Sequence, residues 1–207
     1  PVDTTIYMYY GNGAVGSASS LDNTMTNDYS SDSGLLAQWN MDEGSGTSVA
    51  DSSGNGKTGT TTMDGTGGWY GSDSFFSSGD SLEFDGGGND RMDASIQINT
   101  NLNNDFTLET WAIIDESGDS WSWFFGEAGG GTFVFGKQSG TNKLHYNMDG
   151  IGSNSNIGTY TVGDWHHFAL SHDKSEANEF KFYIDGSLAG TYNEQNAAAS
   201  NGSNIRL

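Results

Sequence analysis

The stretch that decides the fold is Trp165 to Tyr192, WHHFALSHDKSEANEFKFYIDGSLAGTY. From residue 179 to residue 184 apolar side chains alternate strictly with the others, and this period of two is typical of a half-buried strand. Asp185-Gly186 follows, a dipeptide that tolerates the positive φ angles of a two-residue hairpin. An aromatic-rich strand precedes this segment and a return strand follows it. Because such a meander is not stable alone, the rest of the chain must supply a second sheet.

Outward from this stretch, short runs of β-branched and aromatic residues recur between clusters of Gly, Ser, Asn and Asp. Only 33% of the 207 residues are hydrophobic but 13% are aromatic, so we expect a core of few, large side chains. No segment has a sustained helical period. About a dozen short strands at regular spacing predict an all-β fold, a two-sheet antiparallel jelly-roll sandwich. The other predicted strands are Leu35–Asn40, Gly59–Met63, Ser81–Phe84, Arg91–Ile98, Phe106–Ile114, Trp121–Phe125, Thr132–Gly136, Leu144–Tyr146, Thr159–Thr161 and Asn204–Leu207.

The N-terminal segment reads as a strand that is detached from this domain. Residues Thr4 to Tyr10, TTIYMYY, are β-branched and aromatic, and Gly11-Asn12-Gly13 ends the run. Residues 14–34 are rich in Ser, Asn, Asp and Gly and predict a flexible linker. The predicted organisation is therefore a detached strand (1–13), a linker (14–34) and a jelly-roll domain (35–207).

The charge of the chain is strongly negative. Asp and Glu number 27 against 7 Lys and Arg, for a formal net charge of −20, so binding to nucleic acid or to anionic membranes is not expected. The acids are spread along the chain, which favours an adaptation to solubility or to salt, as in a halophilic protein, over a single cation site. No run approaches the ~20 apolar residues of a membrane span. The chain opens on Pro1-Val2-Asp3 rather than Met, which indicates a processed or excised segment.

Four blocks of sequence resemble one known family. They are LLAQWNMDEGSGTSVADSSGNGKTGT (35–60), SLEFDGGGNDRMDA (81–94), FTLETWAII (106–114) and the opening meander. In this order they resemble the laminin-G-like, concanavalin A-like jelly-roll domains. The resemblance implies a non-catalytic, extracellular or cell-surface β-sandwich of the kind found in adhesins, surface proteins and glycan-degrading systems, often with bound calcium.

The sequence departs from this family at both ends. Members continue past the equivalent of Leu207 with a strand that pairs beside the first one, so the resemblance implies a sandwich that lacks its final strand and has an open slot. At the other end, TTIYMYYGNG (4–13) resembles the closing strand of a different β domain that often precedes this family in archaeal and bacterial surface proteins.

The best candidate for a metal site is the loop Asp51 to Gly56, DSSGNG. Calcium binds six to eight hard oxygens, which Asp51, the Gly54 backbone and Asn55 could supply in part. A plain Asp/Asn/Gly turn is an equally good interpretation, and in the family the missing strand carries an acid close to this loop. The other clusters of acids lack EF-hand spacing and are interpreted as solvated turn residues: Asp85 with Asp90, and Asp115 with Glu116 and Asp119.

Residues that could carry catalysis do not form a recognised pattern. Glycosidases of the laminarinase type place paired carboxylates on one strand face, whereas Glu109 lies on its strand alone, with the next acids beyond it. The histidines show no zinc spacing and are interpreted as structural; they are His145, His166, His167 and His172. We therefore expect no enzyme activity, with a glycoside hydrolase as a remote alternative.

Two functions from different classes remain open. A structural subunit could assemble into filaments if the strand carrying Thr4, Ile6, Met8 and Tyr10 entered the open slot of an identical subunit. A calcium-dependent carbohydrate-binding or adhesion module could instead bind glycans or cell-surface proteins. Its candidate sugar-stacking residues, which the core could equally require, are Trp69, Tyr70, Trp121 and Trp123.

Overall fold

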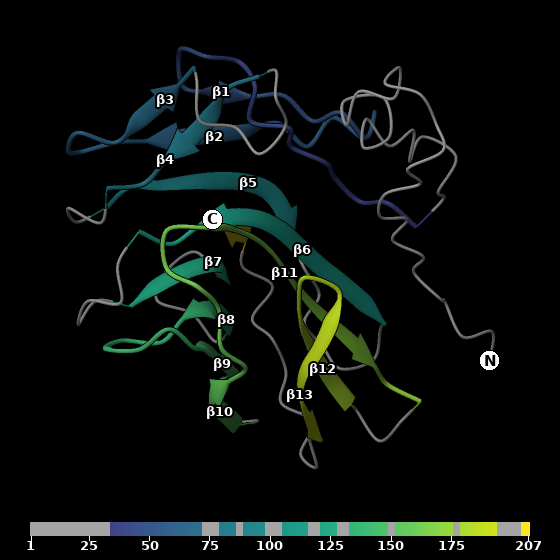
Figure 1. Ribbon diagram of the computed structural model, residues 1–207. Coiled ribbons are helices and arrows are strands. Elements are labelled where there is room, and N and C mark those ends of the chain that lie inside the picture. Colours follow the sequence, from purple (N-terminus) through teal and green to yellow (C-terminus); the bar gives the residue numbers. More distant parts are fainter. Residues whose placement is uncertain are drawn as a thin grey trace, which may run out of the picture.

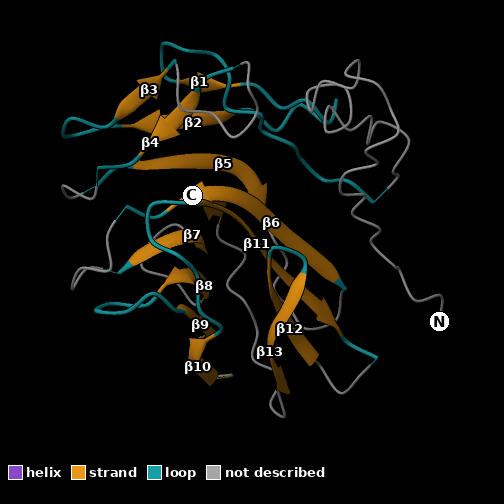
Figure 2. Cartoon of the chain, viewed as in Figure 1, coloured by secondary structure: helices purple, strands orange, loops and turns teal. Residues whose placement is uncertain are grey.

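The computed structural model describes residues 34–71, 79–85, 89–97, 105–115, 121–127, 133–148, 152–175, 179–193 and 204–207. In these ranges the chain forms strands and loops and no helix (Figure 2). The strands are β1 (Ser48–Val49), β2 (Gly59–Thr62), β3 (Gly68–Tyr70), β4 (Ser81–Glu83), β5 (Arg91–Gln97), β6 (Phe106–Ile113), β7 (Ser122–Glu127), β8 (Phe133–Lys137), β9 (Leu144–Met148), β10 (Gly152–Ile157), β11 (Trp165–Asp173), β12 (Glu179–Ile184), β13 (Ser187–Asn193) and β14 (Asn204–Arg206).

The strands form two main layers and one small hairpin (Figure 1). One layer has eight strands in the order β1-β2-β5-β14-β7-β8-β9-β10, and the other has four in the order β13-β12-β11-β6. Strands β3 and β4 form a separate two-stranded sheet beside β1 and β2. All of the strand pairs are antiparallel. The predicted all-β, two-sheet antiparallel jelly roll is confirmed.

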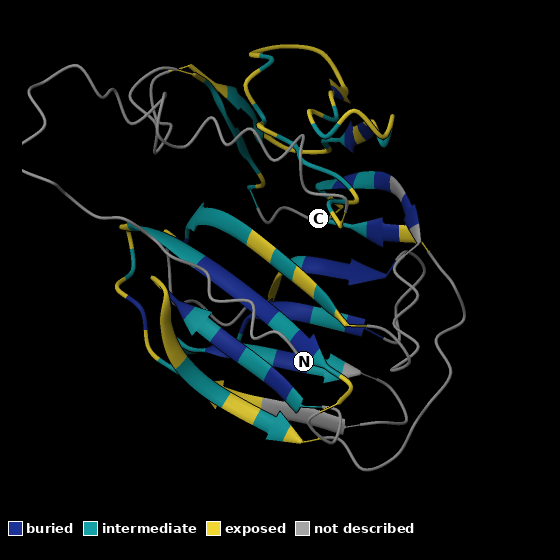
Figure 3. Ribbon diagram, turned by 90° about the vertical axis from the view of Figure 1, so that its right-hand side faces the viewer, coloured by how far each residue is buried: buried dark blue, intermediate teal, exposed yellow. Residues whose placement is uncertain are grey.

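The meander of residues 165–192 forms three of the four strands of the smaller layer, β11, β12 and β13. Strand β12 alternates between buried and half-buried residues along its whole length, with Phe180, Phe182 and Ile184 facing the core (Figure 3). The turn that follows has φ 50° at Asp185 and φ 73° at Gly186. Two successive positive φ angles define the type I′ hairpin, whose twist matches that of the flanking strands. The period of two and the hairpin dipeptide therefore predicted this region correctly.

Aromatic rings fill the space between the two layers. Tyr146 of β9 lies with its ring centroid 4.8 Å from that of Phe180 and 5.5 Å from that of Phe182 on the opposite sheet. Phe124 of β7 stacks on Phe168 of β11 at 4.6 Å, with an angle of 22° between the rings. Tilted and offset ring pairs of this kind are favourable beyond the apolar area they bury. The expected core of few, large side chains is confirmed.

The last strand lies in the middle of the larger layer. Strand β14 pairs with β5 on one side and with β7 on the other. Arg206 donates from Nε to Asp93 Oδ1 at 2.7 Å, and Arg91 Nε lies 3.0 Å from the other oxygen of that carboxylate. Burial raises the pKa of Asp93, but the hydrogen bonds and charges of Arg206 and Arg91 outweigh it and the net pKa is lowered. The predicted strand at the C-terminal end is confirmed.

Two strand predictions were wrong. Leu35–Asn40 forms no ladder in the described residues, only an isolated bridge between Trp39 and Asp51, because its backbone groups bond to loop side chains instead. Thr159–Thr161 is a loop held by Asn142, and the strand lies earlier, at Gly152–Ile157. That strand has the sequence GSNSNI, in which the single apolar residue gives no period of two.

The four-stranded layer ends at β6 in the described part of the chain. Strand β6 is eight residues long and pairs with β11 on one side. Its core-facing residues Leu108 and Ala112 are only partly buried, although they pack against the core. The predicted detached strand and linker lie at residues 1–34, of which 1–33 fall outside the described residues, so that division of the chain stays a prediction.

Candidate functional site

The candidate site is the outward side of β7, β8, β9 and β10 in the larger layer. The strand registers align Trp123 with Gly136, Gly136 with His145, and His145 with Ser155. Residues aligned across a sheet point to the same side, so these four form one row. We call this side of the sheet the uncharged face. Its described residues are Trp121, Trp123, Val134, Gly136, His145, Asn147 and Ser155.

A β-bulge in β7 aims the tryptophans outward. In a regular strand Trp123 and Phe125 would share a face, and Phe124 would point the other way. The register shifts between Trp123 and Phe125, so both phenylalanines contact the core while Trp123 stays on the outside. A bulge of this kind re-aims side chains at the cost of one unpaired residue.

Gly136 makes room for this bulge. A Cβ at Gly136 would overlap the backbone carbonyl oxygen of Ser122 and lie 2.7 Å from Trp123 Cα. Only glycine avoids this overlap, because the obstructing atoms belong to the backbone and cannot rotate away. The absent side chain also lets the rings of Trp123 and His145 approach each other, with centroids 5.8 Å apart.

Three rings gather on the uncharged face, and we call them the aromatic cluster: Trp121, Trp123 and His145. The two indole rings stack with centroids 5.4 Å apart and an angle of 25°. His145 lies 4.7 Å from Trp121, edge to face, and 5.8 Å from Trp123. The tryptophans remain 47% and 39% exposed, so solvent reaches a large part of both rings. Exposed tryptophans held in one orientation by each other offer a rigid apolar surface to a ligand.

His145 adds a polar group to the cluster. Its Nδ1 lies 2.7 Å from the Ser155 hydroxyl, which fixes the orientation of the ring. Burial lowers the pKa of His145, so the imidazole is neutral at pH 7. Among the described residues Nε2 has no hydrogen-bond partner. From the sequence, His145 was interpreted as structural. The alternation in LHYNM (144–148) could have indicated its outward position, because it places His145 on the opposite face from the buried Leu144 and Tyr146.

The other two predicted stacking residues lie elsewhere. Trp69 and Tyr70 belong to β3, in the separate hairpin, so the structure does not bring them to Trp121 and Trp123 (Figure 1). Trp69 donates from its indole nitrogen to the Gly46 carbonyl at 2.8 Å, which ties the hairpin to the loop before β1. Tyr70 is 44% exposed, and its hydrogen bond to Glu83 raises the pKa of the phenol. Sugar stacking at this hairpin stays a prediction.

In the loop from Asp51 to Gly56 the protein itself supplies partners for the polar groups. Asp51 Oδ1 accepts from the backbone N–H groups of Gln38 at 3.0 Å and Ser53 at 2.9 Å, and Oδ2 accepts from Lys57 N–H at 2.8 Å. Burial raises the pKa of Asp51, but the hydrogen bonds from Ser53, Gln38 and Lys57 outweigh it and lower the pKa to about 2. The carboxylate therefore holds the loop against the segment before it.

Asn55 and Gly54 complete this loop. The Asn55 amide donates to the Leu35 carbonyl at 2.8 Å, and Gly54 has φ 83°, which suits glycine. Among the described residues no three His, Cys, Asp or Glu side chains gather as a metal site would require. These contacts account for Asp51, Gly54 and Asn55 as a structural turn, and calcium binding there stays a prediction.

In the first of the other two acidic clusters, Asp85 and Asp90 also accept hydrogen bonds from backbone groups. Asp85 accepts from the N–H of Gly67, and Asp90 accepts from the N–H groups of Asp64 and Asp85. These contacts join the loop after β2 to the loop after β4. Asp115 is exposed, and Glu116 and Asp119 lie outside the described residues.

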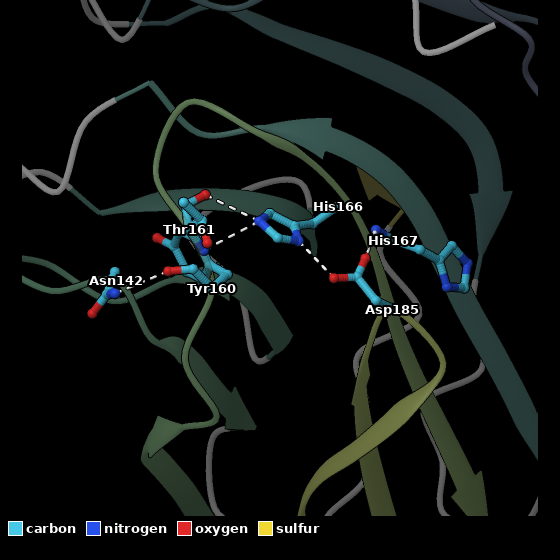
Figure 4. A network of polar contacts seen from close by, with 6 residues as sticks. All are labelled: Asn142, Tyr160, Thr161, His166, His167 and Asp185. Carbon is cyan, nitrogen blue, oxygen red and sulfur yellow. Dashed lines mark hydrogen bonds and ion pairs between the residues drawn. The ribbon is translucent and has the colours of Figure 1, made fainter.

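His166 belongs to a structural network that closes the loop before β11 (Figure 4). Its Nδ1 lies 2.7 Å from Asp185 Oδ2, and its Nε2 lies 3.0 Å from the carbonyl oxygen of Thr161. The other oxygen of Asp185 accepts from the His167 N–H at 3.0 Å. Asp185 lies in the turn between β12 and β13, Thr161 in the loop before β11, and His167 in β11 itself. The network therefore connects the β12–β13 hairpin to β11 and to the loop before it.

His167 points to the other side of β11 from His166, because successive residues of a strand alternate between its faces. Its Nε2 lies 3.5 Å from Glu109 Oε2, and its ring centroid is 5.3 Å from that of Trp111. The residues two positions from Glu109 on its strand are Thr107 and Trp111, so no second carboxylate shares its strand face. His172 is buried against Phe180, with ring centroids 4.5 Å apart.

The comparisons with known proteins agree with this architecture. A family profile described as "Concanavalin A-like lectin/glucanases superfamily" matches residues 85–207, more than half of the chain. The chain belongs to this superfamily. No curated protein matches the chain.

Solved structures with the same fold include several binding domains. The chain is similar to the binding domain of Paraclostridial Mosquitocidal Protein 1, with TM-score 0.56, 12% identity and coverage of 77% of this chain and 43% of that one. It is similar to the binding domain of botulinum neurotoxin DC, solved with rat synaptotagmin II, with TM-score 0.58, 14% identity and coverage of 84% and 43%. It is also similar to domain 4 of AbnA, an extracellular arabinanase from Geobacillus stearothermophilus solved with arabinotriose, with TM-score 0.51, 16% identity and coverage of 76% of both chains.

These similarities concern the fold. The chain spans less than half of the length of the two toxin binding domains. In the residues that the structure describes, no helix has the length and apolar character needed to cross a membrane.

The Asp51 contacts lead to a test of the loop. In Asp51→Asn the amide NH₂ replaces Oδ2 and meets the Lys57 N–H, so we expect a loss of about 1–2 kcal/mol of unfolding free energy at pH 7, measured by urea denaturation. Because the folded pKa is depressed, the contribution of Asp51 is complete above about pH 4 and disappears as the pH falls toward 2. The difference between wild type and variant must therefore shrink across this range. A difference that is independent of pH would contradict the assigned role, and Asp115→Asn, at an exposed turn, is the control.

Proposed function

We propose that this domain is a non-catalytic recognition module that binds carbohydrate through the aromatic cluster. The observation that carries the proposal is the stacked, half-exposed pair Trp121 and Trp123, with the neutral His145 against them. An aromatic ring stacks on the apolar face of a sugar, and a nearby polar side chain orients its hydroxyl groups. A strand bulge and a required glycine hold the cluster in place, whereas packing of the core requires neither indole ring.

The similar structures support a recognition role. The titles of two of them describe toxin binding domains, that of a third describes a domain in complex with arabinotriose, and that of a fourth states that botulinum neurotoxin type C interacts with two ganglioside molecules. Glycans and cell-surface proteins are therefore the partners we infer. An extracellular or cell-surface location follows from such partners, and a surface of net charge −20 suits water of high ionic strength.

The tryptophans provide the test of carbohydrate binding. We expect Trp121→Ala and Trp123→Ala each to weaken glycan binding by about tenfold, because a buried aromatic contact typically contributes more than 1 kcal/mol. Binding is measured on a glycan array and then by calorimetry. Tyr70→Ala is the matched control, an exposed aromatic residue on a different hairpin. A loss confined to Tyr70→Ala would move the site to β3, and an array without any signal would reject carbohydrate binding.

Calcium dependence is a separate part of the proposal. We infer that a calcium ion binds at Asp51, the Gly54 backbone and Asn55, where oxygen ligands are most concentrated in sequence. We expect calcium to raise the midpoint of thermal unfolding and chelator to lower it, with Asp51→Asn abolishing the difference. An unchanged midpoint would exclude the site. Magnesium at equal concentration controls for ionic strength.

The edge strand β6 favours a second function, assembly by strand donation. Its eight residues pair on one side in the described part of the chain, and Leu108 and Ala112 remain only partly buried. An added strand would pair with this edge and cover both side chains. We infer that the strand carrying Thr4, Ile6, Met8 and Tyr10 of an identical subunit is the donor, which makes a filament because the contact does not close on itself.

Size in solution tests the assembly. We expect the full chain to form polymers that grow with salt concentration, because salt screens the repulsion between subunits of charge −20. Deletion of residues 1–13 must give monomers in light scattering, and Met8→Pro in the full-length chain must do the same, since proline cannot complete a strand ladder. Ser17→Pro, in the predicted linker, is the control. Polymers that persist without residues 1–13, or a monomeric wild type at all salt concentrations, would reject strand donation.

A further inference from the structure

The uncharged face differs from the chain as a whole in its lack of exposed charged residues. The chain carries 27 acidic residues and 7 Lys and Arg, yet the strands β7 to β10 contain only two charged residues. These two, Glu127 and Lys137, are buried, at 5% and 2% exposure. The outward residues are instead Trp, His, Asn, Ser, Gly and Val. This mixture of rigid aromatic and adaptable polar groups is typical of surfaces that recognise a ligand.

The net charge of the chain disfavours anionic ligands. A net charge of −20 repels polyanions at moderate salt, and the uncharged face presents no cation among its described residues to offset that repulsion. His145 does not supply one either, because burial lowers its pKa and the ring stays neutral. A glycan that carries carboxylate or sulfate groups would therefore gain nothing here.

The row of aligned residues gives the face a length and a direction. Trp123, Gly136, His145 and Ser155 lie on four adjacent strands, so the row spans about 14 Å across the sheet. Gly136 contributes no side chain and is buried, so the rings of Trp123 and His145 meet above it, with centroids 5.8 Å apart. A row of this length suits a short oligosaccharide better than a single sugar.

We propose that the uncharged face binds a neutral oligosaccharide laid across β7 to β10, and that His145 is the residue that selects and orients it. The inference rests on the proposed carbohydrate binding and adds the class of glycan. One sugar ring stacks on the exposed part of Trp121 and Trp123, and the next lies further along the row, beside His145. There the Nε2 of His145 exchanges a hydrogen bond with a sugar hydroxyl, while Ser155 holds the ring from the other side.

The experiment compares matched neutral and acidic oligosaccharides on the full-length protein. The neutral set is cello-, xylo-, arabino- and malto-oligosaccharides of two to four sugars, and the acidic set is oligogalacturonates and heparan sulfate fragments of the same lengths. Calorimetry is performed at about 0.15 M and 1 M salt. The higher concentration shortens the Debye length from about 8 Å to about 3 Å and so screens most of the charge repulsion. We expect a neutral oligosaccharide to bind with equal affinity at both salt concentrations, and trisaccharides to bind more tightly than disaccharides.

Variants then separate His145 from the tryptophans. His145→Ala is expected to weaken binding of the neutral ligand about fivefold to tenfold, the loss of one hydrogen bond, and to reduce the discrimination between sugars that differ at one hydroxyl. His145→Gln, which keeps a polar group at similar reach, should restore part of the affinity. Leu188→Ser, at an exposed residue of β13, is the control. The thermal unfolding midpoint of each variant verifies that it is folded.

The outcomes distinguish this inference from the function on which it rests. If acidic glycans bind more tightly than neutral ones and lose affinity with Trp121→Ala, carbohydrate binding stands and the neutral ligand is wrong. If neutral glycans bind but His145→Ala leaves both affinity and discrimination unchanged, the assignment of His145 is wrong. If no glycan of either set binds the wild type, the proposed function itself fails and this inference fails with it.

Discussion

The packing of aromatic rings between the two layers is the constraint on which the rest of the structure depends. Each sheet has one apolar face, and the rings of Tyr146, Phe180 and Phe182 interdigitate to bury both at once. With only a third of its residues hydrophobic, the chain must obtain most of its stabilisation from these few large side chains. The sheets are therefore held in one relative position. Because residues alternate along a strand, the inward-facing residues on either side of an outward-facing one also fix its position.

The candidate site is a direct consequence of that packing. The sequence WSWFF would place Trp123 and Phe125 on one side of a regular strand, which would either bury an indole or expose a phenylalanine. The bulge resolves the conflict by turning Phe124 and Phe125 together toward the core, and Gly136 on the neighbouring strand makes the bulge sterically allowed. The exposed tryptophan pair is thus coupled to the core through the backbone of β7. A ligand surface built on strands in this way is more rigid than one built on loops.

Several acidic side chains serve mainly to hold neighbouring segments of the chain together. Asp51 collects three backbone N–H groups, Asp185 holds His166 and the His167 backbone, and Asp93 joins β14 to the sheet through Arg206. Several of the 27 acids therefore have structural partners in addition to their effect on net charge. The face of β7 to β10 differs because its charged residues are buried and its exposed ones are neutral. That contrast, more than any single residue, distinguishes the uncharged face from the rest of this acidic chain.

The sequence by itself determined the fold class, the hairpin at Asp185-Gly186 and most of the strands, because alternation and turn chemistry are local properties. It also named Trp121 and Trp123 as candidate stacking residues, and residues two apart along a strand point the same way. Only the tertiary structure decided that backbone groups of Leu35–Asn40 form hydrogen bonds with loop side chains instead of with a neighbouring strand. It also decided that GSNSNI (152–157) is a strand. It alone brought His145 and Ser155 beside the tryptophans, because that contact depends on the register of four strands. The register of the strands is set by how the whole apolar face is buried, so it cannot be predicted from the local sequence pattern of one strand.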